Sequence, residues 1–131
     1  KTDLTELAHC VEAARRHALA RPDVTFAIWS DGKLHEQWLA CDSQLERISQ
    51  ILGDDLSSQC LALSHTVGTA QIAGFVGTPD AARSRADQQY CYVNGRYVRD
   101  KVIQHAVRQA FADEGWVNLP HDRMHFQAAL I

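Results

Sequence analysis

The sequence lacks any apolar run long enough to cross a membrane and any leader-like start. No hydrophobic stretch approaches the ~20 residues that a membrane-spanning helix needs, and residues 1–10 are acidic and amphipathic, unlike a signal peptide. These absences argue against a membrane partner and predict a cytoplasmic protein. The sequence also does not start with Met, and we expect it to be a piece of a longer protein.

Paired cysteine motifs are also missing. The four cysteines are Cys10, Cys41, Cys60 and Cys91, and no two of them form a C-x-x-C pair. Each lies in an apolar or strand-like context, which favours reduced thiols in a cytosolic protein. Two disulfides remain formally possible.

The sequence has little that points to catalysis. It contains neither a P-loop nor a G-x-G-x-x-G motif. Ser64 and His65 are neighbours in a predicted strand, so their side chains point to opposite faces and cannot pair directly. His121 and His125 straddle a predicted boundary between loop and strand and have no obvious third ligand, which argues against a metal site. We therefore expect no catalytic, cofactor-binding or metal-binding residue in this chain, and no enzymatic activity.

What is present is a clear pattern of helices and strands in a 131-residue chain, the size of one ordinary domain. Periodicity and turn chemistry predict helices at 3–20, 43–52 and 100–112 and strands at 24–29, 33–40, 60–67, 69–77, 89–93 and 124–131. Residues 77–88 are expected to form a mobile loop and 114–122 a second loop. The order predicts an α+β fold, a two-layer sandwich with one mixed or largely antiparallel sheet and helices packed on it, as a single domain over 1–131.

Positive charge is concentrated in one segment of an acidic chain. The net charge is −3, but residues 83–108 hold six basic and two acidic residues and so carry +4, which leaves −7 for the remainder. Lys101, His105 and Arg108 follow at spacings of four and three on one side of the predicted helix, opposite an apolar face. Val102, Ile103, Ala106, Val107, Ala110 and Phe111 form that apolar face.

A turn signal lies just before this helix. Asn94-Gly95 predicts a tight hairpin turn, which we expect to place Arg96 beside the helix N-terminus, where the amides suit a phosphate. Asp100 is the expected N-cap. Together, the side chains of this segment could bind successive phosphates along a nucleic-acid backbone. They are Arg96, Arg99, Lys101, His105 and Arg108. The alternatives are an ordinary turn with a solvated arginine and a solvated helix face, and Arg83 and Arg85 are better explained as solvated loop residues.

The same stretch resembles a known family. Three segments are similar to the second domain of the MutL family of DNA mismatch-repair proteins. They are YVNGRYVRDKVIQHAVRQAF, the A-x-x-x-P-D-V-x-F segment near the start, and GFVGTP at 74–79. The resemblance implies a fold like domain 2 of ribosomal protein S5, with a left-handed β-α-β crossover. It also implies that Arg96 contacts DNA. Arg99, Lys101 and Arg108 join it as candidates on charge and proximity.

The resemblance further implies a role and partners. The domain would couple the ATP-driven change of an adjacent ATPase domain to DNA binding and to recruitment of repair proteins. The implied partners are DNA, a MutS-type mismatch sensor, a downstream repair nuclease or helicase, and a second copy in a homodimer of the intact, nucleoid-associated bacterial protein. The ATP-binding domain would precede Lys1, the ATP-contacting lysine would follow Ile131, and the nuclease domain of some members would lie further on. We therefore expect no cofactor in this fragment and ATP with Mg²⁺ in the intact protein.

Two rival functions remain open. One is a protein–protein interaction or scaffold module, in which the basic residues meet an acidic protein surface or water. The other is a small enzyme of the same S5-like fold class, such as the sugar and mevalonate kinases. The sequence disfavours this second rival because it has no glycine-rich phosphate loop.

Overall fold

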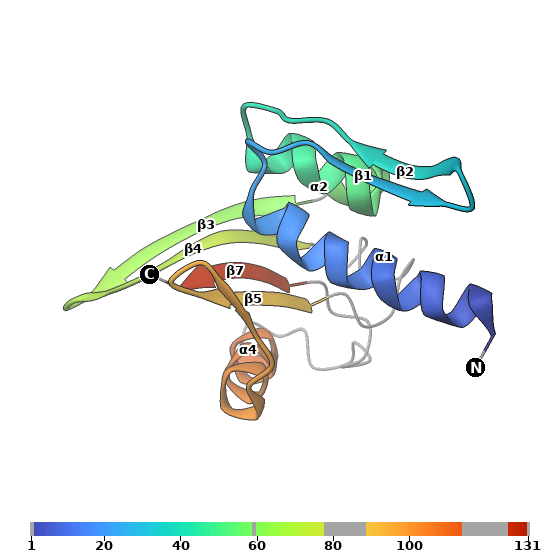
Figure 1. The fold of residues 1–131 in the computed structure, drawn as a ribbon. Helices are drawn as coiled ribbons and strands as arrows, with labels where there is room; N and C mark the ends of the chain where they lie inside the picture. The colour runs from blue at the N-terminus through green and yellow to red at the C-terminus, as the bar shows by residue number, and fades with distance from the viewer. Residues whose placement is uncertain (1, 59, 78–88, 114–125, 131) are drawn as a thin grey trace. The chain divides into compact units, whose positions relative to one another are not determined.

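The computed structural model describes residues 2–58, 60–77, 89–113 and 126–130 (Figure 1). The chain divides into two compact units, Lys1–Ser57 and Ser58–Ile131. Neither unit contains, within the described residues, a helix long and apolar enough to span a membrane. The expected loops 77–88 and 114–122 lie almost entirely outside the described residues.

The first unit combines helices with a separate hairpin. Its elements are α1 (Asp3–Ala20), β1 (Phe26–Ser30), β2 (Lys33–Trp38), α2 (Gln44–Leu52) and most of α3 (Asp54–Ser58). β1 and β2 pair only with each other, as a two-stranded antiparallel sheet. The expectation of one sheet is therefore wrong for this hairpin, because the period-2 pattern predicts strands without specifying which strands pair.

The core of the first unit joins α1 to the hairpin. Its buried centre consists of Val11, Ala18 and Trp38. Along β1, Phe26 and Ile28 are half-buried while Ala27 and Trp29 are exposed, so one face of the strand covers the core. Leu7, Ala14 and Ile51 also pack against this centre.

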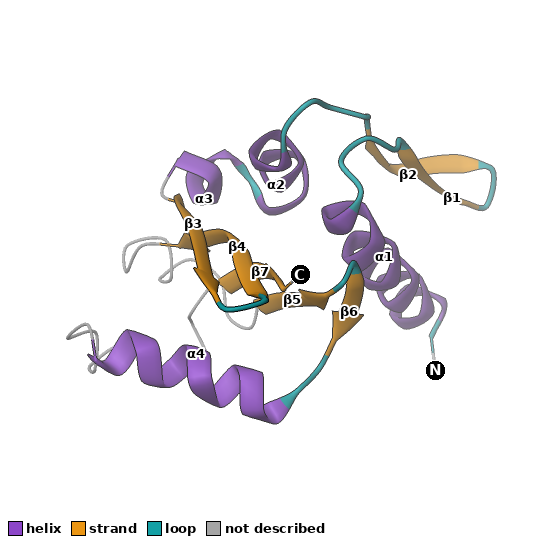
Figure 2. Cartoon of the chain, turned by 90° about the vertical axis from the view of Figure 1, so that its left-hand side faces the viewer, coloured by secondary structure: helices purple, strands orange, loops and turns teal. Residues whose placement is uncertain are grey.

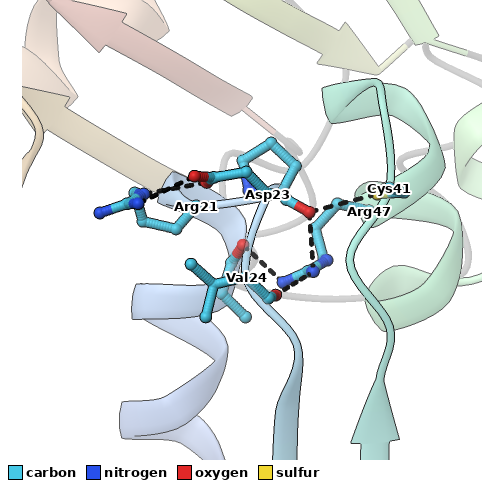
Figure 3. Close-up of polar contacts among 7 residues, drawn as sticks. Arg21, Asp23, Val24, Cys41 and Arg47 are labelled. Atoms are coloured by element: carbon cyan, nitrogen blue, oxygen red, sulfur yellow. Dashed lines mark hydrogen bonds and ion pairs between the residues drawn. The ribbon is translucent and has the colours of Figure 1, made fainter.

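A buried arginine ties the parts of this unit together (Figure 3). Arg47 of α2 is fully buried. Its Nη1 donates to the Ala18 carbonyl at 3.0 Å, and its Nη2 donates to the carbonyls of Pro22 and Leu39, each at 3.1 Å, and to that of Val24. Ala18 lies in the last turn of α1, where carbonyls lack partners within the helix and a cation is favourable.

An exposed ion pair lies in the same connection between α1 and β1 (Figure 3). Arg21 Nη2 lies 2.8 Å from Asp23 Oδ2, and Arg21 Nε donates to Asp23 Oδ1 at 2.9 Å. This hydrogen bond lowers the pKa of the Asp23 carboxyl below its usual value. Because both side chains are well exposed, we assign the pair a local effect on the link and little effect on stability.

The second unit is a five-stranded mixed sheet (Figure 2). Its strands are β3 (Cys60–Val67), β4 (Ala70–Gly77), β5 (Gln89–Val93), β6 (Arg96–Val98) and β7 (Phe126–Leu130), and its helix is α4 (Lys101–Asp113). The strand order is β3-β4-β7-β5-β6, in which only β5 and β7 run parallel. The chain therefore leaves β5, forms β6 and α4, and returns as β7 beside β5. The left-handed sense of this crossover stays a prediction.

Two-residue turns close all three described hairpins. Asp31 and Gly32 have φ of 50° and 75°, and Asn94 and Gly95 have φ of 51° and 83°. Positive φ at both central positions is the requirement of a type I′ turn. In the third hairpin Gly68 has φ of 59° and Thr69 follows it between the paired residues Val67 and Ala70, which suits a type II′ turn.

These elements confirm the predicted α+β class, with helices and a mixed sheet. Two short elements, α3 and β6, have no counterpart among the predicted elements. The expectation of a single domain over 1–131 stays a prediction.

Candidate nucleic-acid interface

The β5–β6 hairpin presents Arg96 directly after its turn. Arg96 pairs with Val93 in the ladder and its side chain is exposed. Residues paired across two strands share a sheet face, so Arg96 lies on the face of Val93, Cys91 and Val98. The Arg96 side chain has neither a hydrogen bond nor an ion pair in the described part of the chain, which leaves its guanidinium available to a ligand.

The opposite face of this hairpin is aromatic. Tyr92 and Tyr97 meet edge to face with ring centroids 5.8 Å apart, and Tyr90 lies 6.2 Å from Tyr97. Tyr90 and Tyr92 are each only 3% exposed. Such aromatic pairs contribute beyond their buried area, so they hold the short β6 strand, and with it Arg96, in place.

The structure corrects the expected position of Arg96 relative to α4. We expected the turn to place Arg96 beside the helix N-terminus, but Arg96 begins β6 and the helix begins only at Lys101. Three extended residues advance the chain by about 10 Å, so β6 separates the two. The local turn signal could not show that the next residues extend the hairpin.

The N-terminus of α4 is occupied by the chain's own carboxylate. Asp100 Oδ1 accepts from the amides of Val102 at 2.7 Å and Ile103 at 3.2 Å, which confirms Asp100 as the N-cap. Because these two amides are already bonded, they do not form an open phosphate site. Any phosphate bound here would depend on side-chain cations instead.

The remaining predicted cations lie on the segment after β6. Arg99 is exposed and takes part in an interaction of its own. Lys101 is exposed, and its side chain makes no hydrogen bond or ion pair within the described residues. His105 is exposed one turn further on. Arg108 belongs to α4, seven positions and nearly two turns after Lys101, and its side chain lies outside the description.

The expected apolar face of α4 is only partly correct. Val102 is 77% exposed and Ala106 is exposed, whereas Ile103 and Gln104 are half-buried. The covered side at the start of the helix is therefore centred on Ile103 and Gln104. Helical spacing identifies a stripe of apolar residues, but packing decides which part of that stripe is covered.

The other candidates do not form a second site in the described residues. Ser64 and His65 are adjacent in β3, pair with different β4 residues and point to opposite faces. Arg83, Arg85, His121 and His125 lie outside the description. The described residues contain no group of three or more His, Cys, Asp or Glu side chains that could hold a metal ion. All four cysteines are free thiols, as expected.

Arg47 was not anticipated as an important residue. A charged residue on a helix usually predicts solvent exposure, and its four carbonyl acceptors lie 8 to 29 residues away in the sequence. No local pattern brings these groups together. Its role is structural, since all its hydrogen bonds go to backbone carbonyls of its own unit.

The sequence is similar to those of known DNA mismatch repair proteins. Residues 48–126 match the family model described as DNA mismatch repair protein, C-terminal domain. The chain is 47% identical over 113 residues to the DNA mismatch repair protein MutL of Herminiimonas arsenicoxydans. It is 42% identical over 115 residues to that of Haemophilus influenzae strain 86-028NP. Each match covers 86% of this chain and 18% of the relative, so the chain spans less than a fifth of these proteins.

Solved structures share the fold at low sequence identity. A crystal structure of the N-terminal domain of a DNA repair protein aligns with a TM-score of 0.73 and 15% identity, over 94% of this chain and 41% of that one. The Aquifex aeolicus MutL ATPase domain complexed with ADP aligns with a TM-score of 0.67 and 18% identity, over 99% of this chain and 43% of that one. The fold is thus that of MutL ATPase-region structures. With the family model matching more than half of its residues, the chain belongs to the MutL family of DNA mismatch repair proteins.

Proposed function

We propose that this chain binds the DNA backbone through Arg96, Arg99, Lys101 and Arg108, and that it transmits the nucleotide state of an adjacent ATPase domain to DNA and to repair partners. The observation that carries the DNA contact is the pair of exposed cations, Arg96 and Lys101, at the two ends of the segment from β6 to the start of α4. Neither side chain has a partner within the described residues. Such cations neutralise phosphates without reading bases.

The coupling part of the proposal places ATP and Mg²⁺ outside these 131 residues. The relatives are more than five times longer than the segment they share with this chain, and the described residues contain no metal-binding cluster. The chain's own contribution is then to hold the cations in a fixed arrangement. The proposed partners are a MutS-type mismatch sensor, a downstream nuclease or helicase, and a second copy of the intact protein.

The test of the DNA contact is a salt titration of DNA affinity. Fluorescence anisotropy with short duplex and single-stranded oligonucleotides measures the log–log slope for the 131-residue chain and its variants. Each phosphate contact contributes about −0.9 to this slope on duplex DNA and about −0.7 on single strands. We expect Arg96→Gln and Lys101→Gln each to weaken binding and to make the slope shallower by about one contact.

The matched control is Lys33→Gln, which removes the same charge from an exposed site in β2 of the other unit. It should leave the slope unchanged. The DNA contact is refuted if both test variants retain the wild-type slope, or if the control lowers it equally. Absence of DNA binding at the lowest salt would favour the interaction or scaffold module.

A further inference from the structure

β3 is a long edge strand of the second unit's sheet, as Figure 2 shows. It pairs with β4 over all eight of its residues, from Cys60 to Val67. Among the described strands it has no neighbour on its other side. Leu61 is 56% exposed and Val67 is 67% exposed, so β3 also presents exposed apolar side chains.

The turn determines which backbone groups point outward. In a hairpin with a two-residue turn the closing pair, here Val67 and Ala70, is hydrogen-bonded, and the pairs then alternate along the ladder. Cys60, Ala62, Ser64 and Thr66 occupy the alternate positions. Their N–H and C=O groups therefore point away from β4, toward the open side of the strand.

β3 has neither the charged residues and prolines nor the bulges that often protect a sheet edge. Its sequence, CLALSHTV, contains no Asp, Glu, Lys, Arg or Pro, and its register with β4 is continuous. The opposite edge of the sheet differs, because β6 has only three residues and begins with a charged one, Arg96. Long, uncharged and regular edges are templates for pairing with another strand.

We propose that β3 pairs with β3 of a second copy of this chain, antiparallel and across a twofold axis. An extended backbone edge is complementary to itself in this orientation, as an isologous interface requires. The two strands carry no formal charge when His65 is neutral, so their approach brings no like charges together. This contact is independent of the proposed DNA-binding residues, all of which lie outside β3.

One register uses every outward group. Centred on Leu63, it pairs Ala62 with Ser64 and Cys60 with Thr66, and so bonds all four outward residues of each strand. Leu63 then faces its own copy in a non-hydrogen-bonded pair, where side chains approach most closely. The contact is small compared with stable interfaces, so the dimer forms only at high protein concentration, on the order of 10 µM to 1 mM.

Sedimentation equilibrium of the 131-residue chain over this concentration range tests the pairing. We expect the mass to rise from monomer toward dimer. Ser64→Pro removes one outward N–H while leaving the bonds to β4 intact, and it should raise the dissociation constant at least tenfold. Ser64→Ala is the matched control and should behave as the wild type, because only its side chain changes.

A second variant keeps the test decisive if proline disturbs folding. Ala62→Lys places a charge at an exposed edge position without affecting the backbone, and it should also raise the dissociation constant at least tenfold. Circular dichroism verifies that each variant is folded. A wild-type chain that stays monomeric throughout, folded Ala62→Lys that dimerises like the wild type, or open-ended assembly beyond a dimer would each overturn the proposal.

Discussion

At the scale of single residues, the first unit depends on a buried cation that forms no ion pair with a carboxylate among residues 2–58 and the other described ranges. Arg47 bonds four backbone carbonyls and its carbon Cζ lies 5.6 Å from the centroid of the Phe26 ring. Its Nε has no hydrogen-bond partner in the described part of the chain. Retaining a buried charge in this way is favourable only because the guanidinium presents several donors in a fixed plane.

Arg47→Met should therefore lower the free energy of unfolding by about 3 kcal/mol, because it removes the hydrogen bonds of the guanidinium and leaves the Val24 carbonyl without a donor among the described residues. Arg47→Lys should recover only part of this loss, since an ammonium cannot reach all four acceptors. Urea denaturation followed by tryptophan fluorescence, to which the core residue Trp38 contributes, measures the effect. The exposed residue Arg21 provides the control, and Arg21→Gln should leave the free energy of unfolding nearly unchanged. Equal stability of Arg47→Met and the wild type would contradict a stabilising role for the Arg47 hydrogen bonds.

Sequence reasoning succeeds at residues whose role is local. Asn94-Gly95 and Asp31-Gly32 predict their turns because positive φ is a property of the two residues themselves. Asp100 predicts a cap for the same reason. The burial of Arg47 could not be predicted, because its hydrogen-bond partners come together only in the folded chain. Its charge instead predicts an exposed side chain.

At the scale of elements, the start of α4 combines a stabilising carboxylate with a cation proposed to bind DNA. Asp100 satisfies two amides of the helix while placing a negative charge next to Lys101. The cap therefore favours the helix and, at the same time, opposes a phosphate at this position.

Asp100→Ala should separate the two effects. Loss of the cap should destabilise the second unit by about 1 kcal/mol, measured as faster amide hydrogen exchange in the first turn of α4. The same change should tighten DNA binding at low salt, because it removes a like charge to the phosphates. Asp100→Asn, which keeps a capping oxygen, should retain most of the protection. If the amides in the first turn of α4 exchange at the same rate in Asp100→Ala as in the wild type, Asp100 does not stabilise the helix as its N-cap.

The elements that the sequence missed or misplaced share a physical cause. β6 has three residues and α3 has five, which is too short for a hydrophobic period to stand out. The covered side of α4 differs from the expected apolar face because Val102 is exposed. The bounds of α1, α2 and α4 agree closely with prediction, because each helix is long enough for its apolar residues to repeat at helical spacing.

At the scale of the whole molecule, the four free thiols differ in their environments. Cys10 is exposed, Cys41 and Cys60 are half-buried and Cys91 is buried. Burial raises the pKa of the Cys60 and Cys91 thiols. A raised pKa leaves less thiolate at a given pH, and the thiolate is the reactive form.

Alkylation should therefore label Cys10 first and Cys91 last. Raising the pH should accelerate labelling of Cys60 and Cys91, and each of these two thiols should need a higher pH in the folded than in the unfolded protein to reach the same rate. Peptide mass spectrometry after timed iodoacetamide treatment measures each site separately, and urea-unfolded protein, in which all four thiols are exposed, is the control. Labelling of folded Cys91 as fast as Cys10 would contradict the burial of β5.

The strand order has a consequence for how the chain is made. β7 is the last strand in the sequence, yet it lies between β4 and β5 and bonds to both. During synthesis the β3–β4 and β5–β6 hairpins emerge first, and each has to wait for residues 126–130 before the sheet can close. Before β7 has emerged, a nascent chain thus exposes two unjoined half-sheets, and residues 126–130 must leave the ribosome before the second unit becomes one cooperative structure.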